Sequence, residues 1–508
     1  MPPSDSRNHQ ALAAICLAAL MFGLEISSVP VILPALEQHL RARFTDLQWV
    51  MNAYTLACTV VLMATGALAD RFGRKRLFVL SILAFGGASL LCGLAHDTAL
   101  LITARGVQGM AGGAMLITQV AILSQQFREG RERGRAFAAW GMVFGIGLGF
   151  GPIIGGAIVA VSSWPWIFLV HLPLALVTCA LAIGGVRESR HEQTGRLDVG
   201  GILLLSLAVL GLTLLLTQGS QWASRPVIGL GILLASLLCI GAFVRVERRH
   251  PQPMFELGVF KNRPFSGALM GSIGMNFSFW PLMIYLPLYF QGALGYDSVA
   301  CGLALLAYTL PTLVFPAVGE RLALRYQAAR VIPGGLWCIG LGFMLMYLGS
   351  RQVDASGLSL LPGCLLAGIG LGITNTPVTN TTTRSLPSAR AGMASGIDMS
   401  ARMISLALNI ALMGLVLVAG IVAYLQPGLI FAVDGQTLYG WAQSIAAGQL
   451  SVVAEGGLQP FSEASARMAL AHGFGWVLLY GCVSVWGLAL GSWLIFNRRQ
   501  CPALGTSV

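Results

Sequence analysis

Long apolar runs occupy most of this 508-residue chain and constrain its fold more than any other feature. A helix needs about 20 mostly apolar residues to cross a hydrocarbon core of about 30 Å. The runs lack the alternation of barrel strands, so helices are the segments that can satisfy their backbone in lipid. The sequence therefore predicts an all-α polytopic membrane protein with fourteen spans, at 11–34, 46–69, 77–96, 99–123, 136–161, 165–186, 198–217, 226–246, 266–291, 298–320, 330–349, 357–379, 393–425 and 470–496.

The charged residues give the orientation of these spans. Only 10% of residues are charged, against roughly 25% in soluble proteins, which excludes an ordinary soluble enzyme. A net charge of +11 would suit a nucleic-acid binder, but the basic residues lie in short loops. With the N-terminus inside, 24 of the 31 Lys and Arg residues fall on cytoplasmic segments. The positive-inside rule then predicts that both termini are cytoplasmic, and no nucleic-acid partner is expected.

A weak internal repeat predicts the domain organisation. The basic loop Gly66–Arg76, after the second span, has an echo at Gly319–Tyr326, after the tenth. Paired halves around a midplane site are a transporter architecture. We expect an N-terminal six-helix bundle at 1–190, an inserted helix pair with its linkers at 191–262, and a C-terminal six-helix bundle at 263–508. The external loop 426–469 is interpreted as a floppy connection in preference to a substrate lid.

Four charged side chains lie clearly inside the predicted spans, away from the span ends: Glu25, Arg105, Asp398 and Arg402. Such residues are costly in lipid and are candidates for function. Burial disfavours the carboxylate of Glu25, so this group can take up and release a proton, or it can be held permanently by an arginine. Asp398 and Arg402 are four residues apart on one helix face, which favours an intrahelical ion pair over a second proton or cation site.

Aromatic residues mark the span 266–291. They could bind a lipophilic cation through cation–π contacts, but anchoring at the membrane interface is the preferred interpretation.

Four segments carry a family resemblance. They are Gly66–Arg76, similar to G-x-L-A-D-R-x-G-R-K/R; Arg105–Gly109, similar to R-x-x-Q-G; Gly147–Gly156, which ends in G-P-x-x-G-G; and Leu24–Pro34, similar to L-D-x-T-x-V-N-V-A-L-P. Together they resemble the major facilitator superfamily, in its fourteen-helix branch of drug:proton antiporters.

The resemblance implies an alternating-access exporter of amphipathic, cationic drugs or toxic compounds in exchange for protons. Its expected partners are a small-molecule substrate, protons and the bilayer of a bacterial plasma membrane, with no enzymatic activity, cofactor or metal. The candidate residues are Glu25, Arg105, Gln108, Asp398 and Arg402 for proton coupling and substrate; Asp70, Arg71, Gly73 and Arg74 for a conformational switch; and Gly147, Gly151, Pro152, Gly155 and Gly156 for a close-packed antiporter helix. Of these, Asp398 stands where the family usually has a neutral residue, so it comes from this sequence and not from the resemblance.

The sequence departs from the family pattern at several positions. Glu25 stands where Asp is usual, Pro30 where Asn is usual, and Pro165 and His171 where Arg and Asn are usual. A dedicated exporter of one metabolite or organic anion remains an alternative, because arginines inside the spans could select an anion. A polytopic membrane enzyme is a remote alternative, since the seven histidines are scattered without metal-ligand or catalytic spacing.

Overall fold

A computed structural model describes residues 3–127, 130–189, 198–217, 222, 225–249, 257–352, 356–386, 391–428, 434–450 and 462–497. Helices make up nearly all of these ranges, which contain no strand. The elements are α1 (Pro3–Ser28), η1 (Val29–Ile32), α2 (Leu33–Leu40), α3 (Phe44–Phe72), α4 (Arg74–Gly93), α5 (Thr98–Gln126), α6 (Gly130–Val161), α7 (Trp166–Leu169), α8 (His171–Gly185), α9 (Val199–Thr217), α11 (Pro226–Arg249), η2 (Leu257–Lys261), α12 (Arg263–Asn276), α13 (Phe279–Leu288), η3 (Tyr289–Ala293), α14 (Ser298–Thr309), α15 (Pro311–Tyr326), α16 (Ala328–Ser350), α17 (Gly357–Arg384), α18 (Ala391–Leu425), η5 (Gln426–Gly428), α19 (Gly435–Ala447) and α21 (Glu463–Asn497).

The helices match the predicted spans closely. Thirteen helices in the described part of the chain are long and apolar enough to cross a membrane, and each overlaps a predicted span. The remaining predicted span, 46–69, lies within the 29-residue helix α3. The all-helical membrane fold is therefore confirmed, while the count of fourteen and the cytoplasmic placement of the termini stay predictions.

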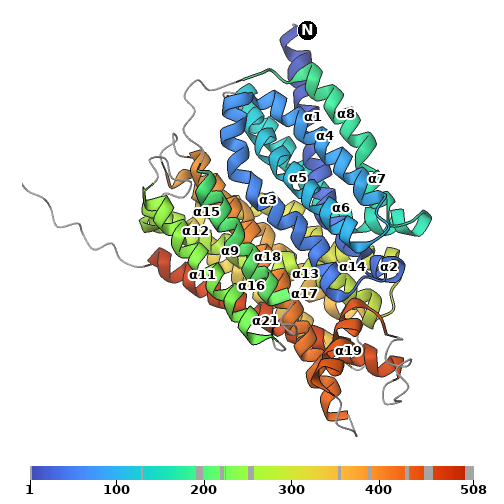
Figure 1. Cartoon of the computed structure of the whole chain (residues 1–508). Helices are drawn as coiled ribbons and strands as arrows, with labels where there is room; N and C mark the ends of the chain where they lie inside the picture. The colour runs from blue at the N-terminus through green and yellow to red at the C-terminus, as the bar shows by residue number, and fades with distance from the viewer. Residues whose placement is uncertain are drawn as a thin grey trace, which may run out of the picture.

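The helices gather into two groups (Figure 1). In the first, α3 packs along α5 and α1 along α6 and α8; in the second, α15 and α16 pack along α17, and α21 along α16 and α18. The equivalent packing of α3 on α5 and of α15 on α17 agrees with the internal repeat. Helix α9 packs against α11 and also contacts both α3 and α18. The division at 190 and 262 stays a prediction.

Helix α6 joins the two groups through close backbone contacts. A Cβ added at Gly147 would lie 2.9 Å from the carbonyl oxygen of Leu20, and one at Gly151 would overlap Ser27 Oγ. A Cβ at Gly155 would lie 3.0 Å from Cβ of Ser28. Glycines at four-residue spacing therefore allow α6 to pack closely against α1. On its other side α6 meets α14, where a Cβ at Gly302 would lie 2.8 Å from the Pro152 carbonyl oxygen. Gly156 also abuts Ser298 of α14.

The segment 426–469, predicted to be an external loop, contains a helix, which corrects its interpretation as a floppy connection. Helix α19 has a buried face of Leu438, Ala442 and Ile445 and packs on α3, α18 and α21. Figure 1 shows it at the same end of the molecule as α2. Apolar residues at helical spacing allow this segment to bury one face, which a simple connection would not do. Residues 429–433 and 451–461 of this loop lie outside the described residues.

Candidate transport site and conformational motifs

A buried ion pair joins the two best candidate residues of the N-terminal half. Glu25 on α1 and Arg105 on α5 both have side chains without solvent exposure, and Nη1 of Arg105 contacts Oε1 of Glu25. Eighty residues apart in sequence, they meet because α1 packs beside α5. In a low-dielectric interior the pair offsets charges that would each be costly alone. The contact between the two residues was one alternative of the sequence interpretation.

Neighbouring polar groups hold Arg105 in place. Its Nη1 donates to Oε1 of Gln108 at 2.6 Å, and its Nε donates to the Val50 carbonyl oxygen at 3.0 Å. Gln108 in turn donates from Nε2 to Ser89 Oγ at 2.9 Å. The guanidinium carbon lies 4.4 Å from the centre of the Tyr54 ring, a cation–π distance. The three-residue spacing of Arg105 and Gln108 therefore puts both side chains into one network.

The third titratable group of this site is His171, which the sequence analysis noted as a departure from the family pattern and did not include among the site residues. It begins α8, is 1% exposed, and places Nδ1 3.5 Å from Oε2 of Glu25. Phe85 meets the imidazole edge-on, with ring centres 5.5 Å apart. The substitution of His for the usual Asn was the sequence signal that could have identified it.

A cavity of about 40 Å³ lies between the two groups of helices, next to this ion pair. Both groups contribute to its lining, which is mostly apolar and includes three methionines and two aromatic rings. Arg105 is its one charged lining residue. The lining residues are Ile26, Pro30, Met51, Tyr54, Thr55, Arg105, Trp280, Met283, Ile284, Met403, Leu406 and Ile410. Apolar walls with few polar groups are typical of small-molecule sites, and methionine adapts to varied shapes.

The aromatic residues of span 266–291 face inward, which corrects the preference for interfacial anchoring. Phe279, Tyr285, Tyr289 and Phe290 are each at most 1% exposed, and Trp280 lines the cavity. Inside a bundle of many helices such residues can face a central cavity, and the sequence of one helix does not tell which neighbours cover it.

A second charged cluster lies in the C-terminal half. Arg402 donates from Nε to Oδ2 of Asp398 at 3.1 Å, which is the expected intrahelical ion pair. Its other nitrogens donate to Asn375 Oδ1 at 2.7 Å and Thr379 Oγ1 at 3.1 Å, and Ser272 Oγ donates to Oδ1 of Asp398. The cluster thus ties α12, α17 and α18 together. None of its members lines the cavity at Arg105.

The carboxylate of Glu188, in the segment that follows α8, contacts the loop between α3 and α4. Gly73 has a φ of 107°, a conformation that favours glycine, and a Cβ there would lie 2.7 Å from the Glu188 carboxylate. Glu188 accepts from the backbone N–H of Lys75 at 3.1 Å and of Arg76 at 3.3 Å. A carboxylate at the N-terminus of α4 is stabilised by the helix dipole.

Arg74 extends the same attachment by donating to Gln125 on α5 at 3.1 Å. The side chains of Asp70 and Arg71, two expected members of the switch, lie outside the described residues. Glu188 was missed by the sequence analysis, since nothing in its local sequence marks it as a partner of this loop.

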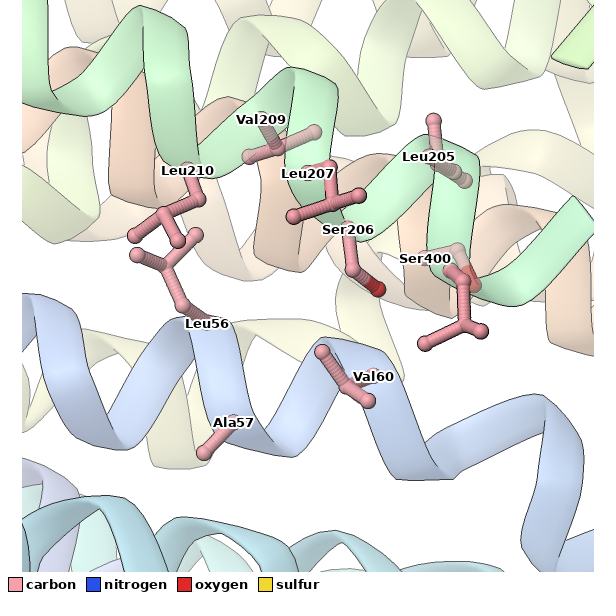
Figure 2. Close-up of a pocket in the computed structure, with 10 residues that line it drawn as sticks. Leu56, Ala57, Val60, Leu205, Ser206, Leu207, Val209, Leu210 and Ser400 are labelled. Carbon is pink, nitrogen blue, oxygen red and sulfur yellow. The ribbon is translucent and has the colours of Figure 1, made fainter. Parts of the chain in front are cut away.

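An apolar cavity of about 170 Å³ lies where α9 meets α3 and α18. Figure 2 shows Leu56 and Val60 of α3 facing Leu207 and Leu210 of α9 across it, with Ser400 of α18 at one side. Leu207 is 54% exposed on the outer side of the bundle. Helix α9 therefore covers the junction between the two groups of helices at this position.

Comparisons with known proteins agree with this architecture. The Major Facilitator Superfamily model matches residues 15–410. Multidrug resistance protein Stp of Mycobacterium tuberculosis is 32% identical over 419 residues, 82% of this chain and 77% of that protein. Puromycin resistance protein pur8 of Streptomyces alboniger is 32% identical over 453 residues, 87% and 88% of the two chains.

A solved structure shares the fold at low sequence identity. A bacterial homologue of the lysosomal transporter Spinster superimposes with a TM-score of 0.67 at 14% identity, covering 99% of this chain and 100% of that one. The family model and the two relatives each cover most of the chain. The chain belongs to the major facilitator superfamily and is a multi-pass membrane protein.

Proposed function

We propose that the protein exports amphipathic, cationic drugs or toxic compounds from a bacterial cell in exchange for protons, without enzymatic activity. The names of its relatives refer to multidrug resistance and puromycin resistance, which supports drug export. The lining of the cavity, largely apolar with three methionines and two aromatic rings, suits lipophilic substrates of several shapes. The cavity of about 40 Å³ must widen to admit a drug-sized molecule.

The Glu25–Arg105 pair is the observation that carries proton coupling. It lies against the cavity, fully buried, and Glu25 is the single acid in contact with Arg105 among the described residues. Protonating Glu25 removes the attraction and frees Arg105, whereas a cationic substrate favours the ionised carboxylate. Proton and drug thus oppose each other at one carboxylate, which is the requirement for exchange.

The contacts between the two groups of helices support an alternating-access cycle. At the α2 end, Gln48 Nε2 donates to the Tyr285 hydroxyl oxygen at 3.1 Å, and Gln291 Nε2 donates to the Val31 carbonyl oxygen at 3.0 Å. If the basic loops face the cytoplasm, this end is external. The structure then corresponds to a state closed to the outside, in which α6 and α14 act as the hinge region.

A dedicated exporter of one organic anion is the second candidate, because Arg105 is the one charged residue lining the cavity. Its neutralisation by Glu25 argues against anion selection. Substrate breadth separates the two. Purified protein in vesicles with an imposed pH gradient should accumulate several lipophilic cations and no organic anion. Accumulation of one organic anion and of no cation would indicate the dedicated exporter instead.

A further inference from the structure

The surroundings of His171 complement a doubly protonated imidazole ring. Nδ1 lies 3.1 Å from the carbonyl oxygen of Ile167, and Nε2 lies 3.2 Å from the carbonyl oxygen of Met21. A carbonyl oxygen can only accept, and a neutral imidazole has one N–H to donate. The neutral ring would leave a nitrogen lone pair facing an oxygen lone pair, whereas the imidazolium donates to both carbonyls.

Glu25 supplies the counter-charge for such an imidazolium. Its Oε1 is taken by Arg105, while its Oε2 is buried without a hydrogen-bond partner among the described residues. That second oxygen lies 3.5 Å from Nδ1 of His171. The carboxylate is thus flanked by the guanidinium on one oxygen and by the imidazole on the other.

The other groups around His171 carry no further acid within the described residues that contact it. Helix α1 brings Glu25, α5 brings Arg105 behind it, and α3 brings the phenol of Tyr54 against Arg105. Helix α4 contributes the ring of Phe85. A proton on His171 therefore raises the net charge of this cluster from neutral to +1, with one carboxylate to balance two cations.

We propose that His171 is a proton-binding site of this transporter and that it exchanges its proton with Glu25, an inference that rests on the proposed antiport. In the exchange the Nδ1–H bond breaks and an O–H bond forms at Oε2 of Glu25. A neutral imidazole remains, and its Nε2–H donates to the carbonyl oxygen of Met21. An Asn at this position, as in the family pattern, could not hold a proton.

This site gives a charge-based coupling that does not need the proton and the drug to share atoms. The cavity is lined by Arg105, and His171 lies behind the ion pair and outside the lining. A cationic substrate in the cavity is repelled by a cluster of charge +1 more than by a neutral one. Substrate binding should therefore release the proton of His171, and protonation of His171 should expel the substrate.

The protonation state can be read directly by ¹⁵N nuclear magnetic resonance of the full chain, labelled in histidine and held in lipid nanodiscs. The spectrum of His171→Asn, subtracted from that of the wild type, assigns the ring. Without substrate we expect a form of the ring with both nitrogens protonated, and saturating tetraphenylphosphonium should convert it to a single-N–H form. A neutral ring with and without this cation, over the whole pH range of the folded protein, would overturn the proposal.

Proton release gives an independent readout. Adding tetraphenylphosphonium to wild-type protein in weak buffer should release protons, and His171→Asn should release fewer. His472→Asn is the matched control, because His472 places one ring nitrogen 3.1 Å from a carbonyl oxygen, that of Gly420. Equal release from wild type and His171→Asn would refute the role of His171 while leaving antiport intact. If wild type shows no coupled transport, the antiport proposal fails, and the ¹⁵N spectrum still decides the protonation of His171.

Discussion

At the scale of single residues, the losses of stability caused by removing the charge of Glu25 and that of Arg105 should not be additive. Arg105→Ala leaves the carboxylate of Glu25 buried without its cation, and breaking a buried ion pair in this way costs about 3–5 kcal/mol. Glu25→Gln combined with Arg105→Gln removes both charges and should restore much of that loss. Thermal unfolding of the single variants Glu25→Gln and Arg105→Gln and of the double variant, all in detergent, measures the difference. Strictly additive effects would contradict a direct ion pair.

Glu25 and Arg105 could be identified from the sequence because charges inside apolar runs stand out against their surroundings, and Gln108 because Arg105–Gly109 resembles R-x-x-Q-G. Sequence reasoning missed Glu188 because that acid lies in a charged, ordinary-looking segment after a span, and its contact with Gly73 depends on how α8 ends beside α4. His171 was visible only as a departure from the family pattern. A residue whose role comes from the faces of three helices cannot be assigned from its own helix alone.

At the scale of elements, the glycines of α6 make a sharp prediction. Gly151→Ala puts a methyl group onto Ser27 Oγ, and overpacking of this kind typically costs 1–3 kcal/mol. Gly141→Ala, on the same helix, meets nothing within 4 Å and should be neutral. Transport rate and thermal stability are the measurements. Ser27→Gly should partly rescue Gly151→Ala, and equal behaviour of the Gly141 and Gly151 variants would contradict the close packing.

The loop between α3 and α4 gives a second prediction at this scale. Gly73→Ala forces an alanine to a φ of 107° and onto the Glu188 carboxylate, so it should slow transport and lower stability. Glu188→Gln keeps the shape but weakens the interaction with the N-terminus of α4, by about 0.3–1 kcal/mol. Gly87→Ala on α4, with no atom within 4 Å, is the control. A Gly73 variant as active and stable as the Gly87 variant would rule out the switch.

The predicted spans agree with the observed helices because length and hydropathy decide which segments can cross a membrane. Helix α19 was missed for the same reason, since its 13 residues are too few for a span. The aromatic residues of α13 were predicted to lie at the membrane interface, but they lie inside the bundle. Hydropathy indicates that a helix can enter the membrane, and it does not indicate which helices pack against it.

At the scale of the whole molecule, proton-coupled export depends on one connection between a cavity and a buried carboxylate. The cavity of about 40 Å³ lies between the two groups of helices, and Arg105 connects it to Glu25. Removing the titratable acid should uncouple the two movements without destroying the path for the drug. Exchange of one drug molecule for another needs only the path for the drug, whereas proton-driven uptake needs the path and the titratable acid.

The most direct test measures both reactions in the same vesicles, for wild type and for Glu25→Gln. With an imposed pH gradient, wild type should accumulate tetraphenylphosphonium with counterflow of protons, and Glu25→Gln should accumulate none. Without a gradient, both should exchange labelled for unlabelled tetraphenylphosphonium. If the imposed pH gradient still drives accumulation of the cation by Glu25→Gln as it does by wild type, Glu25 does not couple transport to protons and the central claim is wrong.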